Sequence, residues 1–161
     1  MAERIPVESS DLSSYFEGIE PGDIYLIPGD KGAEVWESYI ESPVTSYFKL
    51  PDDNWVSQAE MLEVGDWQTA YNADRNEDLV NQLEPYVNWK KSATVYFLAK
   101  KSLVLETTWG SFLSYWDCFL AIQDDCPIIF AKGSDYFGLM FRPVGDVVAL
   151  SRKKDAKPPK V

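Results

Sequence analysis

Short apolar segments in the second half of the chain, several of them joined by very short turns, most constrain the fold. Gly133-Ser134-Asp135 separates two of these segments, and Pro143-Val144-Gly145-Asp146 separates the next two. Turns this short favour antiparallel neighbours, because a parallel connection needs a crossover of a dozen or more residues. We therefore expect an α+β fold built on an antiparallel sheet of about five strands. The expected strands are residues 94–99, 103–106, 127–131, 136–142 and 147–151.

A stripe of aromatic and aliphatic side chains predicts the helix that packs against this sheet. Six of them recur at the three- and four-residue spacing of one helix face: Trp109, Phe112, Leu113, Trp116, Phe119 and Leu120. Thr107 or Thr108 precedes the stripe and can cap the helix. We therefore expect this aromatic-rich helix to cover one face of the sheet.

The first half of the chain predicts short helices and strands around the sheet. Turn-forming pairs such as Pro21-Gly22 and Pro28-Gly29 separate brief periodic segments, and residues 55–75 fit no single pattern. With no internal repeat or linker, we expect residues 1–151 to form one domain and residues 152–161 a basic, mobile tail. The expected elements are helices at 9–17, 33–41 and 78–86, a strand at 23–27 and an edge strand at 46–50.

Acidic side chains are concentrated in the first half of the chain. The formal net charge is −11, from 15 basic and 26 acidic side chains. Residues 1–89 contain 4 basic and 19 acidic side chains, whereas residues 152–161 contain 5 basic and 1 acidic. A one-sided negative field repels nucleic acid and anionic membranes and attracts basic protein surfaces. Solubility alone is the simpler explanation of the acidic side chains. The basic tail, rather than binding nucleic acid or lipid, could fold back on the acidic half of the same chain.

The absence of histidine excludes several enzyme classes. With no histidine in the chain, Ser-His-Asp and Cys-His catalysis and histidine-ligated zinc are impossible. Cys118 and Cys126 match no zinc or redox spacing, and we expect both to be structural. The sequence also shows no signal peptide and no apolar run long enough to span a membrane. We therefore expect a cytoplasmic protein that is not an enzyme and has no cofactor.

Two segments place acids beside an aromatic residue and are the best candidates for a partner-binding surface. Tryptophan anchors many protein interfaces, and acids next to it would meet lysine or arginine. Both segments, residues 52–55 and 65–67, are expected in loops. The tryptophans could instead stack a sugar or small ligand, or belong to the core. The candidate partner-binding residues are Asp52, Asp53, Trp55, Asp66 and Trp67.

Carboxylates near the end of the aromatic helix offer an alternative function. Asp117, Asp124 and Asp125 could together hold a divalent metal and support a metal-dependent enzyme. A metal site draws its ligands from several segments around a pocket, and a single sequence does not establish that these carboxylates converge. Adjacent aspartates are also common in a loop that enters a strand.

Several motifs resemble those of a family of small uncharacterised bacterial proteins. The resemblance rests on residues 108–117 (TWGSFLSYWD), 124–127 (DDCP) and 141–146 (FRPVGD), and it extends to residues 38–43 and 65–72. It implies a bacterial, cytoplasmic origin and assigns no activity. In composition, the chain is also similar to acidic bacterial immunity proteins, which block basic toxin domains. We therefore expect a non-enzymatic binding or inhibitory protein whose acidic first half docks a basic protein partner.

Overall fold

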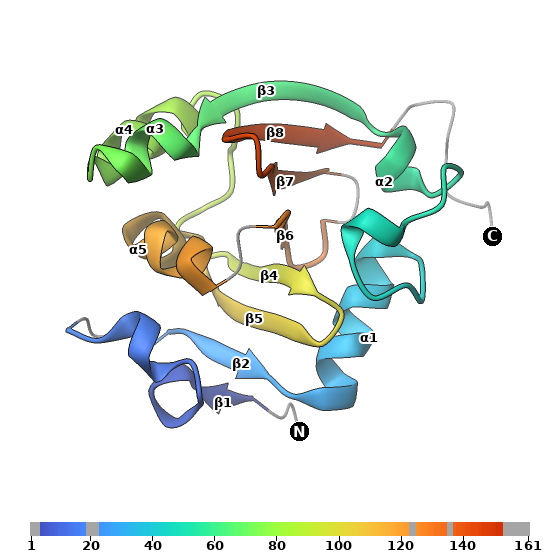
Figure 1. Cartoon of the computed structure of the whole chain (residues 1–161), viewed down its shortest axis with the longest axis horizontal. Helices are drawn as coiled ribbons and strands as arrows, with labels where there is room; N and C mark the ends of the chain where they lie inside the picture. Colours follow the sequence, from blue (N-terminus) through green and yellow to red (C-terminus); the bar gives the residue numbers. More distant parts are fainter. Residues whose placement is uncertain (1–3, 19–22, 123–124, 135–136, 153–161) are drawn as a thin grey trace.

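An antiparallel sheet runs through the centre of the protein (Figure 1). The computed structural model describes residues 4–18, 23–122, 125–134 and 137–152, and eight strands within these ranges form the sheet. Their spatial order is β1-β2-β5-β4-β6-β7-β8-β3, with antiparallel pairing throughout. The strands are β1 (Ile5–Pro6), β2 (Tyr25–Ile27), β3 (Glu60–Asp66), β4 (Thr94–Lys100), β5 (Leu103–Thr108), β6 (Ile128–Ala131), β7 (Phe137–Phe141) and β8 (Asp146–Ser151).

The α+β class and the antiparallel sheet are confirmed, but the sheet is larger than the expected five strands. Those five strands are β4 to β8, and the first half of the chain adds β1 and β2 at one edge and β3 at the other. The strand expected at residues 23–27 is β2, which proves to be part of this sheet, whereas β1 has only two residues and gives no alternation that a sequence pattern can reveal. First-half elements therefore complete the sheet rather than only surrounding it.

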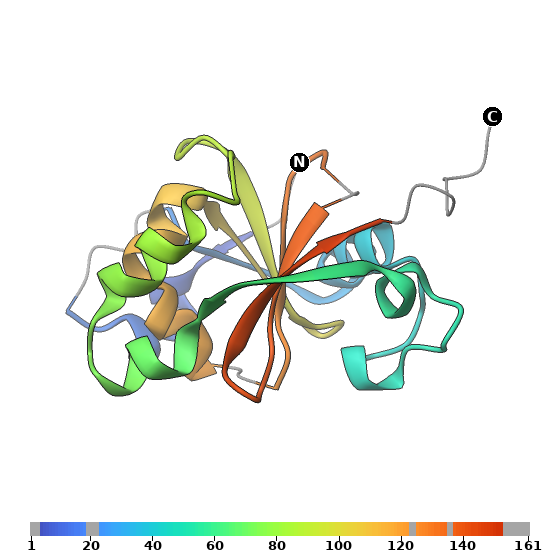
Figure 2. The ribbon, with the colours of Figure 1, turned by 90° about the horizontal axis from the view of Figure 1, so that it is seen from above.

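Helices cover both faces of the sheet (Figure 2). α3, α4 and α5 pack on one face, with the 3₁₀ helices η1 and η2, and α1 and α2 pack on the other. β4 and β6 lie at the centre, so their side chains are buried on both faces. The helices are α1 (Gly29–Ile40), α2 (Trp55–Gln58), α3 (Trp67–Asn72), α4 (Asn76–Leu83), α5 (Trp109–Ile122), η1 (Val7–Ser9), η2 (Ser13–Phe16) and η3 (Tyr47–Lys49).

The aromatic stripe is confirmed as the buried face of α5. All six side chains of the stripe are buried, and Trp109 stacks on Phe112 with ring centroids 5.7 Å apart. The hydroxyl of Thr108 accepts a hydrogen bond from the Ser111 N–H at 3.1 Å, as expected of an N-cap. Tyr115 departs from helical geometry (φ −130°, ψ 25°), so two helical segments share this one buried face.

Two expected elements differ in type from the structure. Residues 46–50, expected as an edge strand, instead contain the 3₁₀ helix η3. The Lys49 and Leu50 N–H groups donate to the carbonyls of Ser46 and Tyr47, three residues earlier, which is the hydrogen-bond pattern of a 3₁₀ helix. The expected helix at residues 9–17 is replaced by η1 and η2. Among the described residues, no helix is both long and apolar enough to cross a membrane.

Candidate partner-binding surface

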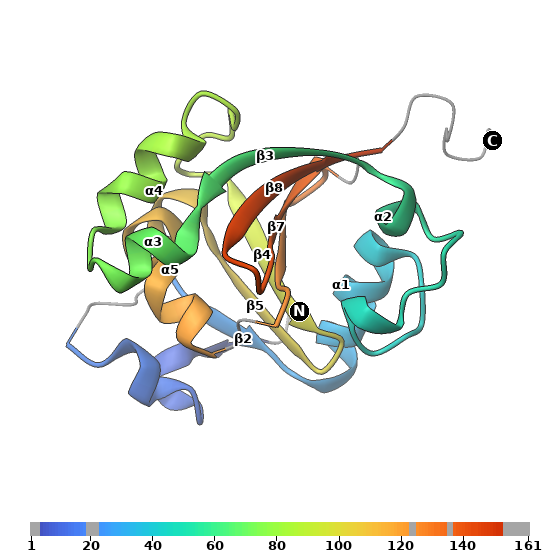
Figure 3. The ribbon, with the colours of Figure 1, turned by 45° about the horizontal axis from the view of Figure 1, so that its top comes forward.

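β3 connects the two candidate segments along one edge of the sheet (Figure 3). Residues 52–55 precede its first residue, Glu60, and Trp67 follows its last residue, Asp66. The seven residues of β3 span roughly 20 Å, so the structure does not bring the two segments into one cluster. It places them at opposite ends of the same edge strand.

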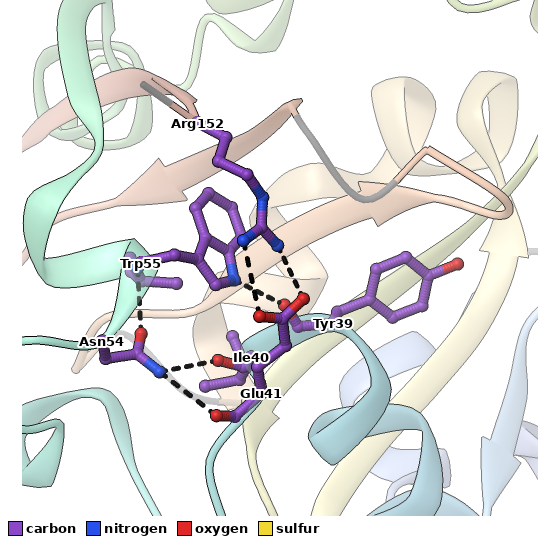
Figure 4. Close-up of polar contacts among 7 residues, drawn as sticks. Tyr39, Ile40, Glu41, Asn54, Trp55 and Arg152 are labelled. Carbon is purple, nitrogen blue, oxygen red and sulfur yellow. Dashed lines mark hydrogen bonds and ion pairs between the residues drawn. The ribbon is translucent and has the colours of Figure 1, made fainter. Parts of the chain in front are cut away.

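The first segment is fixed by hydrogen bonds to the end of α1 (Figure 4). The side-chain oxygen of Asn54 accepts from the Val56 N–H at 2.9 Å and caps α2, while its amide nitrogen donates to the Ile40 carbonyl at 2.8 Å. The indole N–H of Trp55 donates to the Tyr39 carbonyl at 2.9 Å. Both polar groups therefore point into the protein and hold α2 against α1.

Arg152 packs over the ring of Trp55 (Figure 4). Its Cζ lies 4.4 Å from the ring centroid, and its Nη2 lies 2.7 Å from Oε2 of Glu41. Only 7% of the Arg152 side chain is exposed. The expectation that the mobile tail begins at residue 152 is therefore wrong for Arg152, because the cation is held between a ring and a carboxylate. Residues 153–161 lie outside the described ranges.

The second segment is fixed to the turn between β7 and β8. Asp66 caps α3: its Oδ1 accepts from the Thr69 N–H at 3.0 Å, and its Oδ2 accepts from the Thr69 hydroxyl at 2.7 Å. The indole N–H of Trp67 donates to the Arg142 carbonyl at 2.8 Å. The Gln68 N–H donates to the Gly145 carbonyl at 3.1 Å, so the start of α3 is tied to this turn at two points.

The rings of Trp55 and Trp67 are buried in the structure and so offer no exposed surface. They are 7% and 6% exposed, and each indole N–H is satisfied by a backbone carbonyl. Their flanking acids do reach the surface: Asp52 and Asp53 are exposed, and Asp66 is partly exposed. The acids of the two segments thus remain available to a partner, while the aromatic rings belong to the core.

The acids next to β3 belong to a larger acidic strip, which we define as residues 50–88 and which comprises α2, β3, α3 and α4. The strip contains nine acidic side chains and one basic side chain. The basic side chain, Arg75, is 3.0 Å from Asp78 and so is already paired within the strip. The acids are Asp52, Asp53, Glu60, Glu63, Asp66, Asp74, Glu77, Asp78 and Glu84.

The acidic strip also carries exposed apolar side chains, and the two on β3 escaped the sequence interpretation. Met61 and Leu62 on β3 are 41% and 55% exposed, and Tyr71 and Tyr86 are also exposed. Within the strip the sequence singled out only residues 52–55 and 65–67, and Met61 and Leu62 were missed because residues 55–75 fit neither helical nor strand periodicity. A useful signal is present in residues 60–63, where two adjacent apolar residues lie between two glutamates.

The metal alternative gains no support from the described residues. Asp117 is half-buried on α5, Asp125 is exposed in the loop before β6, and Asp124 lies outside the described residues. Within the described ranges, no three side chains of the metal-binding types gather into one group. A site that needs all three of these aspartates is therefore not tested.

The two cysteines are poor nucleophiles at neutral pH. Burial is the largest cause that raises the pKa of Cys118, and together with the charge of Asp117 and a hydrogen bond to it brings this pKa to about 11. Burial also raises the pKa of Cys126 to about 12, against the opposing effect of Arg142. Both thiols stay protonated near pH 7, as expected of structural cysteines.

Alkylation of Cys118 by iodoacetamide at pH 8 should be about a hundredfold slower than that of a free thiol with a pKa of 9.0, because only the thiolate reacts. The rate should rise about tenfold per pH unit up to pH 11. Mass spectrometry of Cys126→Ser, which leaves Cys118 as the single thiol, measures it. In Asp117→Asn the rate should rise by less than the full hundredfold, because burial is the larger cause. A rate equal to that of the free thiol would contradict this assignment.

Trp89 lines a hollow of about 220 Å³ on the α4–α5 side of the sheet. It is the one tryptophan of the six that is not fully buried, and its ring packs edge-on against Trp109 with centroids 5.0 Å apart. Glu84 and Lys91 provide opposite charges at the same hollow. A small-ligand site that uses an exposed tryptophan would therefore lie here, away from Trp55 and Trp67.

Comparison with known proteins matches residues 20–147 to a family described as "Protein of unknown function (DUF2947)". The matched region includes both candidate segments, the acidic strip and all strands from β2 to β7. No curated protein and no solved structure matches the chain. The expected resemblance to a family of uncharacterised proteins is confirmed.

Proposed function

The chain belongs to the DUF2947 family, whose function is unknown, and we propose that it is a non-enzymatic binding protein that docks a basic protein partner through its acidic strip. The observation that carries this proposal is the charge of the strip, nine acids against one base, along a single edge of the fold. Solubility requires acidic residues but does not require them to be so concentrated. A concentrated field accelerates encounter with an oppositely charged protein.

The acidic strip also offers contacts that hold a partner after encounter. Met61, Leu62, Tyr71 and Tyr86 are exposed between and beside its acids. Exposed apolar and aromatic side chains supply most of the binding energy at protein interfaces, whereas rim charges mainly set the association rate and the salt dependence. This combination suits an inhibitory, immunity-like protein in the bacterial cytoplasm that covers a basic surface of its target.

The test is affinity capture from a lysate of the source cells, with the protein immobilised. Wild type should retain proteins of high isoelectric point and release them as salt rises from about 50 mM to about 500 mM, because exposed charges are screened over this range. Asp52→Lys combined with Asp53→Lys should reduce the captured amount about tenfold.

The matched control reverses the same amount of charge elsewhere. Glu8→Lys combined with Asp11→Lys changes two exposed acids near η1, at the opposite edge of the sheet. This control should capture the same basic proteins nearly as well as wild type. Equal loss in both double variants, or capture that is indifferent to salt, would show that the strip has no specific role.

A second candidate function is small-ligand binding in the Trp89 hollow, favoured by the partly exposed indole next to Glu84 and Lys91. Titration with a panel of sugars and small zwitterions should then shift the tryptophan fluorescence of wild type and not of Trp89→Phe. A panel that leaves the emission of wild type unchanged would remove this candidate.

A further inference from the structure

We infer that the partner binds by strand addition: an extended segment with the pattern basic–apolar–apolar–basic pairs with residues 60–63 of β3 and becomes a ninth strand of the sheet. This inference rests on the proposed function and adds to it the binding mode and the sequence pattern of the partner. β3 is suited to this role by its open edge, its exposed side chains and its charge.

The open part of the β3 edge is confined to residues 60–63. Among the described residues, β3 pairs with β8 alone and is the last strand of the sheet. At its other end the edge is occupied by α4, where the Asp66 N–H donates to the Gln82 side chain at 2.8 Å. A Cβ on Gly65 would lie 3.0 Å from Leu79, which shows how closely α4 approaches there. A partner strand therefore has access to Glu60–Glu63 and not to the end of β3.

The two edges of the sheet differ in how well they are protected against strand addition. β1, at the opposite edge, has two residues and one of them is Pro6, which has no N–H to donate. β3 has seven residues without proline or lysine, and Met61 and Leu62 are exposed on it. A long edge strand with exposed apolar side chains is a template for pairing with another chain.

The side chains of residues 60–63 specify the pattern of the partner strand. Successive side chains of a strand point to opposite faces, so Glu60 and Leu62 share one face while Met61 and Glu63 share the other. Lysine or arginine opposite each glutamate and an apolar residue opposite Met61 and Leu62 make favourable cross-strand pairs. Because the pattern acidic–apolar–apolar–acidic of residues 60–63 is the same in both directions, a partner with the pattern basic–apolar–apolar–basic fits in a parallel or an antiparallel orientation.

The same charges select against a second copy of this chain. Antiparallel pairing of two β3 strands over residues 60–63 would place Glu60 of one copy opposite Glu63 of the other, and parallel pairing would place each glutamate opposite itself. Like charges directly opposite one another destabilise a strand pair. Neither glutamate forms an ion pair with another described residue, so both are available to a basic strand.

The experiment uses the full chain and three capped ten-residue peptides in isothermal titration calorimetry. The first peptide has the central sequence Lys-Val-Val-Lys flanked by threonines, and the second has Glu-Val-Val-Glu in the same frame. The third repeats the first with N-methyl groups on its four central amides, so it keeps its charges but loses the donors for strand pairing. Hydrogen exchange of the protein is measured with each peptide, because pairing slows the exchange of outward-facing β3 amides.

We expect the lysine peptide to bind, to slow exchange within residues 60–63 about tenfold, and to bind at least about tenfold more tightly than the other two peptides. Glu60→Lys with Glu63→Lys should abolish this binding, while Glu8→Lys with Asp11→Lys should preserve it. Equal binding of the methylated and unmethylated lysine peptides without protection of β3 would overturn strand addition and leave acidic docking standing. No binding of the lysine peptide, or dimerisation of wild type through β3, would also overturn it. Failure of the proposed function is seen separately, in the lysate capture.

Discussion

Replacement of Trp55 by alanine should lower the free energy of unfolding by about 3–5 kcal/mol, as for other large side chains removed from a core. Trp55 packs near Phe130, with ring centroids 6.0 Å apart, and its indole N–H donates to the Tyr39 carbonyl. Alanine would leave a cavity and a buried carbonyl without its donor. It would also uncover the guanidinium of Arg152, which lies over the ring. Urea unfolding followed by circular dichroism measures the change.

Conservative variants separate the stability of this region from partner binding. Trp55→Phe keeps a ring but loses the hydrogen bond, and we expect a loss of about 1–2 kcal/mol. Asp52→Asn combined with Asp53→Asn changes two exposed acids, so stability should change by at most about 0.5 kcal/mol. If Trp55→Ala kept its stability within about 1 kcal/mol of wild type and lost only partner binding, Trp55 would be an interface anchor rather than a core residue.

The second half of the chain could be predicted because its local pattern and its tertiary environment agree. In α5 the apolar spacing of one helix face coincides with the buried face, and Thr108 caps the helix as expected. In β7 the side chains alternate between the two cores, with Leu139 in one and Met140 in the other. The turns between these strands are too short for the crossover that parallel pairing needs, so the strands had to pair antiparallel.

β3 could not be read from the sequence because an edge strand is not buried on either face along its open part. Residues 60–63 are all exposed, and the first buried side chain of the strand is Val64. The register also shifts between Glu63 and Gly65, which interrupts any strict alternation. Pairing with β8, rather than any pattern within β3, determines its conformation.

The structure leaves the acids of the two candidate segments exposed or partly exposed and buries their tryptophans. The number of acids follows from composition, and an acidic side chain can lie exposed to solvent without a specific neighbouring residue. The burial of Trp55 depends on carbonyl groups and side chains far along the chain, including Arg152, which is 97 positions away in the numbering. An acid next to a tryptophan is therefore compatible with a surface anchor and equally with a helix cap that precedes a buried ring, as Asp66 and Trp67 demonstrate.

Replacement of Gly138 by alanine should lower the free energy of unfolding by about 3 kcal/mol, because an added methyl group overpacks the core. A Cβ at this position of β7 would lie 2.6 Å from Cε1 of Phe130 and 3.0 Å from the carbonyl oxygen of Ile129. Phe130 has little freedom to move aside, since its ring stacks on Tyr39 with centroids 5.0 Å apart. The backbone carbonyl is fixed in the ladder between β6 and β7. Thermal and urea unfolding of the variant measure the loss.

A double-mutant cycle with Phe130→Leu tests whether the cost arises from this contact. Leucine removes the ring atoms that the new methyl group would meet, so Gly138→Ala should cost at least about 1 kcal/mol less in the Phe130→Leu background than in wild type. Phe130 lies on the α1 face of the sheet together with Trp55 and Tyr39. If the two costs simply add, the Phe130 ring would not be the source of the loss, and the contact with the Ile129 carbonyl, which Phe130→Leu leaves in place, would have to account for it.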